Sequence, residues 1–543
     1  MIHKLLLALW IVLLTAVSFF HFPGHTILQS DTQIYIPILE RLWDQSLFTR
    51  DIMALHPHVA FTVYDEVAIA LRRITGAEFE PILMAQQFLF RAAGIAGLYL
   101  LGTGIGFSTG AAMLVTCIAS LSTFVNGPAV ILVEYEPVPR GFALPCLVLA
   151  LGLVAHSRWK AAALATAVAF VFHPPTALAF YLCLLGLILW KRQYQAIWPL
   201  AAAAAIMTGF VLAQPPVADH LGVFSRLSPE LEKLQRMRAS YNWVSIWIRA
   251  WASQYAFLWI VGMVALYRLR ERIRPTMLLL LAGLPLIGIL SLPLSWILLE
   301  NLKLAVISQF QPGRYLLYVP LFAMILCPMA GIVAAQRRRY LEALLFFLVP
   351  FAMPMQYNIF DVVLGKWDNM AVMHRIELIL GLSAGAVAIA IGCGRPKFGP
   401  VVTLAALLPF FLIPQFGQVR NYAAVHHREL NELAAWARSS TSKDALFQFA
   451  DAGQNLTPGI FRARSLRALY VDWKSGGQVN FLKEFSSVWW ERWQRLEKPQ
   501  PLPVYRDLGI DYVVFSALHP QPDAQPLYQN SKYLVYDVRP PRN

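Results

Sequence analysis

The sequence has few charged residues for its length. Asp, Glu, Lys and Arg make up only 14% of its 543 residues, whereas a soluble globular domain carries about 25%. Hydrophobic residues make up 57%, and the mean hydropathy is +0.53. The apolar residues form continuous runs rather than an alternating pattern, which excludes a transmembrane β-barrel. The composition therefore predicts a polytopic α-helical membrane protein.

Motifs for common soluble chemistries are also missing. No glycine-rich phosphate loop, zinc-ligand motif or nucleophile elbow occurs in the sequence. The five cysteines lie within or beside apolar runs, none at metal-ligand spacing, and are interpreted as small apolar fillers. They are Cys117, Cys146, Cys183, Cys327 and Cys393. The sequence thus names no metal ligand, and it leaves a divalent metal cofactor open.

The net charge of +14 does not indicate nucleic-acid binding. Basic residues occur in short clusters between apolar runs, as the positive-inside rule produces in membrane proteins. We therefore expect the lipid bilayer, and no nucleic acid, as a partner.

About thirteen apolar runs are long enough, or nearly so, to cross a bilayer. The first, after Met1, lacks a small-x-small cleavage site before His21 and is interpreted as a retained span rather than a signal peptide. The runs are 4–22, 82–102, 108–126, 141–156, 160–173, 175–190, 196–214, 246–267, 275–299, 315–335, 340–355, 374–393 and 399–416.

With thirteen spans, every basic cluster falls on one side of the membrane. This side is predicted to be cytoplasmic, with the N-terminus on it, in the cytoplasmic (inner) membrane. The longer loops and the C-terminus then face out, and chemistry is expected there. These outer segments are 23–81, 127–140, 215–245, 300–314, 356–373 and 417–543.

Residues 417–543 form a second domain by composition, after a membrane domain at 1–416. Short apolar segments at 445–449, 467–471, 511–515 and 533–537 are typical of buried strands. Helical patterns occur at 430–438, near 479–496 and at 503–508. Strands that alternate with helices predict a small extracytoplasmic α/β domain.

The segment 29–51 directly follows the first span and carries four acids. This half-apolar, acidic pattern predicts a helix in the membrane interface. Asp31, at its start, is either a helix N-cap or a catalytic acid. Ser30 and Gln33 have capping-box spacing, so Ser30 could cap the helix and leave Asp31 free.

Further candidates lie near the outer membrane surface. Glu134, Glu136 and Arg140 share one proline-stiffened loop, which is either a binding site or a solvated loop. His173 interrupts an apolar run, as a functional group or as a histidine that bonds a helix end. Arg314 suits a lipid phosphate, because its planar fork donates two hydrogen bonds, or it snorkels to the interface. Arg91 lies within the second span and needs a partner.

The topology and three short motifs resemble the GT-C superfamily of integral-membrane glycosyltransferases. The motifs are Ser30-Asp31-x-x-x-Tyr35, Leu47-Phe-x-x-Asp51 and Pro139-Arg140. They are most similar to an uncharacterised bacterial branch. The first outer loop lacks that branch's adjacent Asp-Glu pair near its start, because Asp65-Glu66 lies much further along.

The resemblance implies sugar transfer from a polyprenyl-phosphate donor to a lipid, glycan or protein acceptor. Asp31, the first-loop acid, would orient or deprotonate the acceptor hydroxyl as it displaces the lipid phosphate. Arg140 or Arg314 would stabilise charge on that phosphate. The remaining candidates are assigned to substrate binding: Tyr35, Asp51, Glu134, Glu136 and His173.

Three alternatives stay open at this point. A transporter or lipid flippase would place several ionisable residues deep in its spans, whereas here Arg91 and His173 are the main ones. A polysaccharide polymerase or ligase would carry an arginine-rich outer loop, which is not seen. An inactive GT-C-like scaffold would share the topology without the activity.

Overall fold

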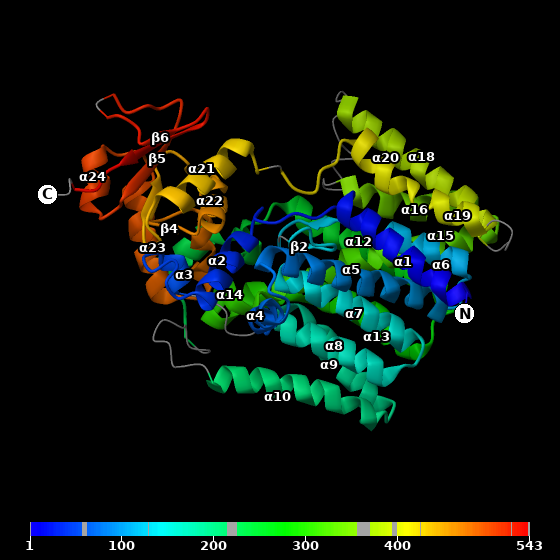
Figure 1. Ribbon diagram of the computed structural model, residues 1–543. Helices are drawn as coiled ribbons and strands as arrows, with labels where there is room; N and C mark the ends of the chain where they lie inside the picture. The colour runs from blue at the N-terminus through cyan, green and yellow to red at the C-terminus, as the bar shows by residue number, and fades with distance from the viewer. Residues whose placement is uncertain are drawn as a thin grey trace.

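The computed structural model describes residues 2–56, 62–128, 130–213, 225–355, 370–393, 399–423, 425–522 and 524–540. The described chain is mostly helical, with a large helical body and a smaller part that contains a sheet (Figure 1). The N-terminus lies at the far end of the helical body, and the C-terminus lies in the smaller part. The predicted outer loops at 215–245 and 356–373 lie partly or mostly outside the described residues.

The helical body includes helices from the N-terminus to Gly417. Those before residue 214 are α1 (Ile2–Phe20), α2 (Thr32–Trp43), α3 (Ile52–Leu55), α4 (Tyr64–Thr75), α5 (Phe79–Gly104), α6 (Thr109–Ala119), α7 (Pro139–Ala155), α8 (Trp159–Phe172), α9 (Pro174–Trp190) and α10 (Ile197–Ala213). Those after residue 224 are α11 (Pro229–Arg238), α12 (Arg249–Leu269), α13 (Pro275–Ser295), α14 (Ala305–Phe310), η5 (Pro312–Leu317), α15 (Tyr318–Gln336), α16 (Tyr340–Ala352), α18 (Met370–Gly392), α19 (Gly399–Ala405) and α20 (Leu408–Gly417). A hairpin of β1 (Phe124–Val125) and β2 (Val130–Ile131) precedes α7.

Apolar helices give the chain a membrane location. Within the part of the chain that the structure describes, four helical segments are long and apolar enough to cross a bilayer: Arg249–Leu269, Pro275–Asn301, Ala305–Gln336 and Met370–Gly392. Shorter apolar helices, such as Pro139–Ala155 and Trp159–Phe172, coincide with other predicted runs. The count of thirteen spans, the inner membrane and the orientation stay predictions.

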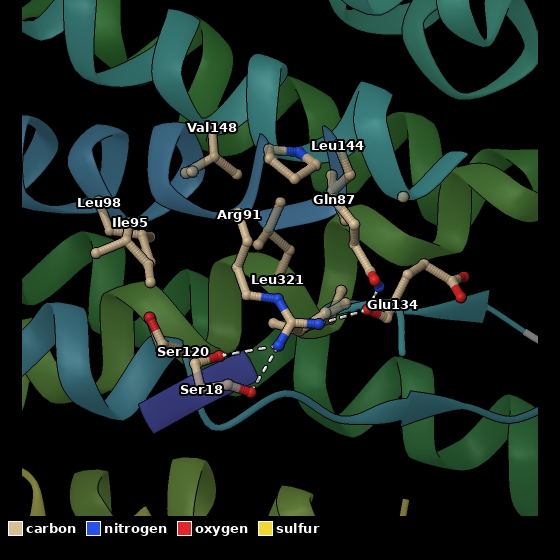
Figure 2. Close-up of a pocket in the computed structure, with 16 residues that line it drawn as sticks. Ser18, Gln87, Arg91, Ile95, Leu98, Ser120, Glu134, Leu144, Val148 and Leu321 are labelled. Atoms are coloured by element: carbon tan, nitrogen blue, oxygen red, sulfur yellow. Dashed lines mark hydrogen bonds between the residues drawn. The ribbon is translucent and has the colours of Figure 1, made fainter. Parts of the chain in front are cut away.

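Arg91, for which the sequence offered no partner, is satisfied by backbone carbonyl groups. Its guanidinium donates to the carbonyl oxygens of Ser18 at 2.6 Å, Gly24 at 3.1 Å and Glu134 at 2.7 Å. These contacts lie at the polar end of a pocket that is otherwise lined mainly by apolar side chains of the helical body (Figure 2). Arg91 therefore ties the end of α1 and the loop around Glu134 to α5.

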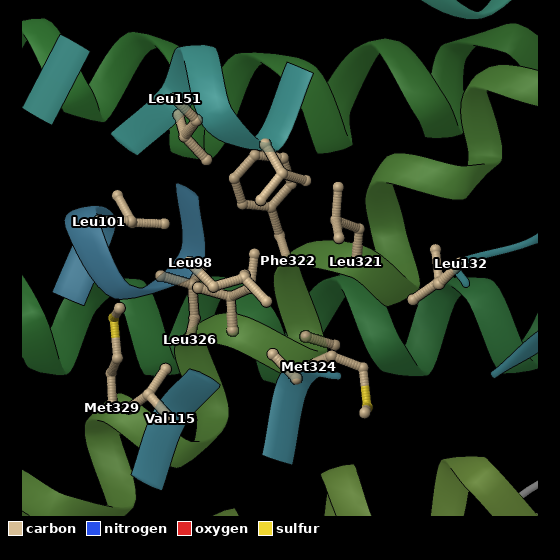
Figure 3. Packing of buried hydrophobic residues seen from close by; sticks show 14 of the residues in the cluster. Leu98, Leu101, Val115, Leu132, Leu151, Leu321, Phe322, Met324, Leu326 and Met329 are labelled. Atoms are coloured by element: carbon tan, nitrogen blue, oxygen red, sulfur yellow. The ribbon is translucent and has the colours of Figure 1, made fainter. Parts of the chain in front are cut away.

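Helix α15 lies at the centre of the apolar core. Every residue from Tyr318 to Ala335 is buried, as expected for a helix that is hydrophobic all round. Its Leu321, Phe322 and Leu326 lie in the same cluster as Leu98 of α5 and Leu151 of α7 (Figure 3). The core thus supplies a rigid base for the loops at the end of the helical body that carries Glu134.

The C-terminal part contains a five-stranded mixed sheet in the order β4-β3-β5-β7-β6. Strand β3 pairs in parallel with β4 and β5, whereas β7 is antiparallel to β5 and β6. The strands are β3 (Leu446–Phe449), β4 (Ala468–Leu469), β5 (Tyr512–Ser516), β6 (Tyr528–Gln529) and β7 (Tyr533–Asp537). The helices are α21 (Arg428–Ser440), α22 (Thr457–Ser465), η8 (Lys474–Asn480), α23 (Lys483–Leu496) and α24 (Leu502–Asp507). All four predicted strands are present, whereas β6 and α22 were not predicted.

Helix α2 links the two parts. Ile34 and Ile38 pack with the β5 residue Val513 in one cluster, and Ile36 and Leu39 pack with the other face of the sheet and the helical body. The first half of α2 is therefore buried in protein, and its position in the membrane interface stays a prediction. Pro37 lies inside the helix without ending it.

Candidate active site

Glu136 fixes the start of α2. Its carboxylate accepts hydrogen bonds from the backbone N–H groups of Gln29, Ser30 and Asp31 at 2.8–2.9 Å, and from the Thr32 hydroxyl. A helix N-terminus has unpaired N–H groups and a partial positive charge, so a carboxylate is stabilising there. The predicted capping box is wrong, because Glu136 replaces it and the Gln33 amide donates to the Leu28 carbonyl oxygen instead.

The Asp31 side chain is consequently free of the backbone. Asp31 occupies the N-cap position, but its carboxylate makes no capping hydrogen bond. Its Oδ2 atom accepts from Arg140 Nη1 at 2.6 Å, and its Oδ1 atom accepts from Lys474 Nζ at 2.6 Å. The Asp31 side chain is 27% exposed, against 17% for Arg140 and 15% for Lys474. A partly accessible carboxylate therefore lies between two partly buried cations.

The two cations control the ionisation of Asp31. Burial alone would raise the pKa of its carboxyl, but Lys474 and then Arg140 outweigh burial and hold the pKa well below its usual range. Asp31 is thus ionised at every physiological pH. Such a carboxylate is a weak base, but it holds both cations in fixed positions.

Arg140 also pairs with Glu134. Its Nε atom lies 2.5 Å from Glu134 Oε1, whereas Glu134 Oε2 is buried without a hydrogen-bond partner among the described residues. Pro139 begins α7, so Arg140 lies in the first turn of that helix. Burial is the main reason that the pKa values of Glu134 and Glu136 are raised.

Arg314 brings a third cation to the site. It lies in η5, its Nε atom donates to the Gln311 side chain, and its guanidinium carbon lies 5.8 Å from the Tyr241 ring centroid. Its Nη1 atom is buried and has no hydrogen-bond partner in the described part of the chain. A buried guanidinium with a free donor is prepared to bind an anion.

Tyr35 connects these charged groups. Burial raises the pKa of its phenol, followed by the nearby carboxylates of Asp31 and Asp65, while Arg140 and Arg314 act in the opposite sense. The Tyr35 ring packs on the Tyr64 ring, with centroids 5.2 Å apart. Tyr35 therefore lies within the field of Asp31 and Arg140 and also of Arg314, and its contact with a substrate stays a prediction.

His173 fills a structural position between α8 and α9. Its Nδ1 atom accepts a hydrogen bond from the Thr176 backbone N–H at 3.2 Å and lies 2.8 Å from the Thr176 hydroxyl. Of the two interpretations of His173 from the sequence, these contacts agree with a histidine that bonds a helix end. Its Nε2 atom is left for other partners, so a binding role stays a prediction.

Asp51 is not part of this cluster. Its Oδ1 atom caps α3 through the N–H groups of Met53 and Ala54, and its Oδ2 atom pairs with Arg462 Nε at 2.8 Å. The same oxygen accepts from the Leu469 N–H at 2.9 Å, and the side chain is 1% exposed. With both oxygens occupied, Asp51 has no atom left for a substrate.

Lys474 was missed by sequence reasoning. It begins η8 in the C-terminal part, and its ammonium group also donates to the Ser30 hydroxyl at 2.9 Å. A single lysine in a polar segment gives no local signal of function. Only its contact with Asp31, 443 positions away, identifies it.

These carboxylates do not fit a divalent metal ion. Among the described residues, no group of three or more His, Cys, Asp or Glu side chains is arranged to hold one. Asp31 is neutralised by two cations, and Glu136 is engaged by backbone N–H groups.

Comparison with solved structures gives two kinds of neighbour. ArnT from Cupriavidus metallidurans aligns over 100% of both chains in its apo state, with 14% identity and a TM-score of 0.46. The same protein bound to undecaprenyl phosphate gives 12% identity and a TM-score of 0.47, over 100% of this chain and 99% of that one. ArnT is a GT-C superfamily glycosyltransferase.

The other neighbour is the archaeal oligosaccharyltransferase AglB from Archaeoglobus fulgidus, in complex with an inhibitory peptide and a dolichol-phosphate. It has 12% identity and a TM-score of 0.38, over 94% of this chain and 69% of that chain. No family model and no curated protein sequence matches the chain. Because the three TM-scores lie below 0.5, the roles proposed below depend on the contacts of this chain's own residues.

Proposed function

We propose that this protein is a membrane glycosyltransferase that moves a sugar from a polyprenyl-phosphate donor to an acceptor hydroxyl on the outer face of the cytoplasmic membrane. The observation that carries the proposal is the position of the Asp31 carboxylate. It lies between Arg140 and Lys474, beside the loop that closes one end of an apolar helical body. Cations prearranged in this way suit a phosphate that arrives on a lipid chain.

The donor phosphate would bind the site through its cations. Arg314 offers a buried N–H donor that has no partner among the residues the structure describes, and Arg140 and Lys474 are held in place by Asp31. When the glycosidic bond breaks, negative charge grows on the phosphate oxygen that leaves with the lipid. Fixed cations stabilise that charge more than they stabilise the intact donor, which lowers the barrier.

Asp31 has the central positioning role in this scheme. Its carboxylate fixes Arg140 and Lys474 before the donor arrives, so neither side chain must be ordered during the reaction. Glu136 in turn positions Asp31 through the backbone at the start of α2. Tyr35, in the same field, would contact the sugar or the acceptor.

The outward orientation rests on the charge pattern of the sequence. Short basic clusters on one side of the predicted spans favour a cytoplasmic N-terminus, which leaves the Asp31 loop and the C-terminal domain outside. A lipid-anchored donor explains why such chemistry would be carried by an apolar helical body.

The test is sugar transfer by the purified protein in proteoliposomes. A panel of polyprenyl phosphates that carry radiolabelled hexoses or pentoses is supplied, and release of the lipid phosphate is measured. We expect Asp31→Asn to lower transfer at least about 10²-fold, the usual cost of losing one fixed electrostatic group. Asp44→Asn is the matched control, since Asp44 is 40% exposed at the end of α2.

Two results would contradict the proposal. Full activity of Asp31→Asn would remove Asp31 from the mechanism. Uptake of labelled substrate into the vesicles without any sugar transfer would instead favour a transporter.

A further inference from the structure

A second acid, Asp65, lies in the same region and pairs with no cation of the described chain. It is in the first turn of α4 and is 5% exposed. Its Oδ1 atom is buried and has no hydrogen-bond partner among the described residues. Asp65 therefore contrasts with Asp31, whose two oxygens are both occupied by cations.

Helix capping does not account for Asp65. A carboxylate near a helix N-terminus usually bonds the free N–H groups there. In α4 the N-cap is Val63, which makes no side-chain cap, and the buried oxygen of Asp65 accepts no backbone hydrogen bond. Because a buried polar group without a partner costs stability, its retention calls for another explanation.

The start of α4 is fixed beside the active site. The Tyr64 hydroxyl donates to the Pro137 carbonyl oxygen at 2.6 Å, in the loop that carries Glu136 and Arg140. The Tyr64 ring also packs on Tyr35 of α2. On the other side, the Val63 N–H donates to the Val171 carbonyl oxygen at 3.0 Å, close to His173.

We propose that Asp65 is the general base that deprotonates the acceptor hydroxyl, and that Asp31 serves only to position the cations. This assignment rests on the proposed glycosyltransferase function and divides its two acidic roles between two residues. Tyr35, whose ring packs on Tyr64, lies within electrostatic range of both carboxylates.

The step balances as a single displacement. The acceptor oxygen forms a bond to the anomeric carbon of the sugar, and its proton passes to the Asp65 carboxylate. The bond between the anomeric carbon and the phosphate oxygen breaks, and the electron pair leaves with the polyprenyl phosphate. The proton is then released from Asp65 to water.

The surroundings of Asp65 suit a general base, and those of Asp31 suit a residue that positions cations. Burial raises the pKa of Asp65 to about 7, with a smaller contribution from Glu66. A general base works best when its pKa lies near the working pH. Asp31, with a pKa well below its usual range, cannot meet that condition.

The other charged groups around α4 are engaged elsewhere or lie at its far end. Arg72 pairs with Glu40 of α2 at 3.0 Å and with Glu78 at 2.9 Å. Glu80 of α5 pairs with Arg464 at 2.5 Å. Among the described residues, the titratable groups that interact electrostatically with Asp65 are Glu66 and Tyr64 on α4 and Tyr35 on α2.

The experiment compares the pH dependence of transfer for the wild type, Asp65→Asn and Glu66→Gln. The wild-type kcat/KM should rise as the pH increases through about 7, because the base must be deprotonated. Asp65→Asn should lose this dependence and about 10²–10⁴-fold of the rate. Asp65→Glu, which keeps a carboxylate, should retain a rising limb, and Glu66→Gln should resemble the wild type.

Azide then separates a base from a structural residue. Azide is already an anion and attacks the anomeric carbon without proton removal, so it should restore release of polyprenyl phosphate by Asp65→Asn and form a glycosyl azide. It should not rescue Asp31→Asn. Rescue of Asp31→Asn alone, or wild-type rate and pH dependence in Asp65→Asn, would overturn the assignment. If the wild type consumes no donor, the glycosyltransferase function itself fails, and the assignment fails with it.

Discussion

At the scale of single residues, two aspartates of the predicted first outer loop have opposite surroundings. Asp31 is ionised between Arg140 and Lys474, whereas Asp65 is buried and pairs with no cation among the described residues. Paired acids with divergent pKa values are a common way to divide roles in an active site. Residue type alone does not distinguish them, because the difference comes from their neighbours.

The stability of the protein should depend on Asp65. Burial raises its pKa from the ordinary 3.8 to about 7, so between these pH values the folded chain keeps a proton that the unfolded chain releases. The wild type therefore loses stability as the pH rises through this interval, and the loss is complete above the folded pKa. Asp65→Asn avoids the loss, which amounts to at most about 4 kcal/mol for a shift of about three units.

The measurement is the thermal unfolding temperature at pH 4 and at pH 8. We expect Asp65→Asn to unfold at a higher temperature than the wild type at pH 8, and the two to converge at pH 4. Asp44→Asn provides the exposed control. An equal difference at both pH values would show that Asp65 is not buried in its neutral form.

Four of the candidates taken from the sequence lie together in the structure, and their catalytic and binding roles stay predictions. Asp31, Glu134, Glu136 and Arg140 were candidates because they lie near the predicted outer membrane surface, and contacts join all four. The role of Glu136 as a helix cap was not foreseen, since it acts on a helix more than 100 residues away. Lys474 had no local signal at all.

At the scale of elements, a buried charge network joins α3 to the C-terminal part. Arg462 lies between Asp51 and Asp472, and all three side chains are 1% exposed. Asp472 precedes Lys474 by two residues, so this network also holds the segment that enters the active site. From its motif alone, Asp51 was interpreted as a substrate-binding residue, because a motif cannot show which way a side chain points.

Asp51→Asn should therefore destabilise the protein more than it affects catalysis. Removal of one charge from a buried network leaves Arg462 partly unpaired and costs about 3–5 kcal/mol. Thermal unfolding and the transfer rate per folded molecule are measured together. Loss of activity without loss of stability in Asp51→Asn would return Asp51 to the proposed active site.

At the scale of the whole molecule, the proposed active site is shared by distant parts of the chain. Asp31 precedes α2, Arg140 lies at the start of α7, Arg314 in η5 and Lys474 in the C-terminal part. Lys474→Met should lower transfer about 10–100-fold through loss of one charged hydrogen bond. Lys483→Met, an exposed lysine of the same part, should leave transfer unchanged, and equal effects of the two variants would contradict the shared site.

Much of the architecture followed from the sequence. Long apolar runs and four short strand patterns correspond to helices and strands of the structure, because burial in a membrane or a sheet leaves a strong local pattern. The contact between the helical body and the C-terminal part could not be predicted from the sequence. The residues of α2 that make it, such as Ile34 and Ile38, look the same whether they face lipid or protein.

The central claim, that the cations around Asp31 receive a lipid phosphate, is tested most directly by ligand binding. Affinities of the purified protein for decaprenyl phosphate and for decaprenol, its uncharged alcohol, are measured for the wild type, Arg314→Met and the exposed control Lys303→Met. We predict that the wild type and Lys303→Met prefer the phosphate, and that Arg314→Met loses about 10–100-fold of that preference. Equal binding of phosphate and alcohol by the wild type, or an unchanged preference in Arg314→Met, would contradict the account.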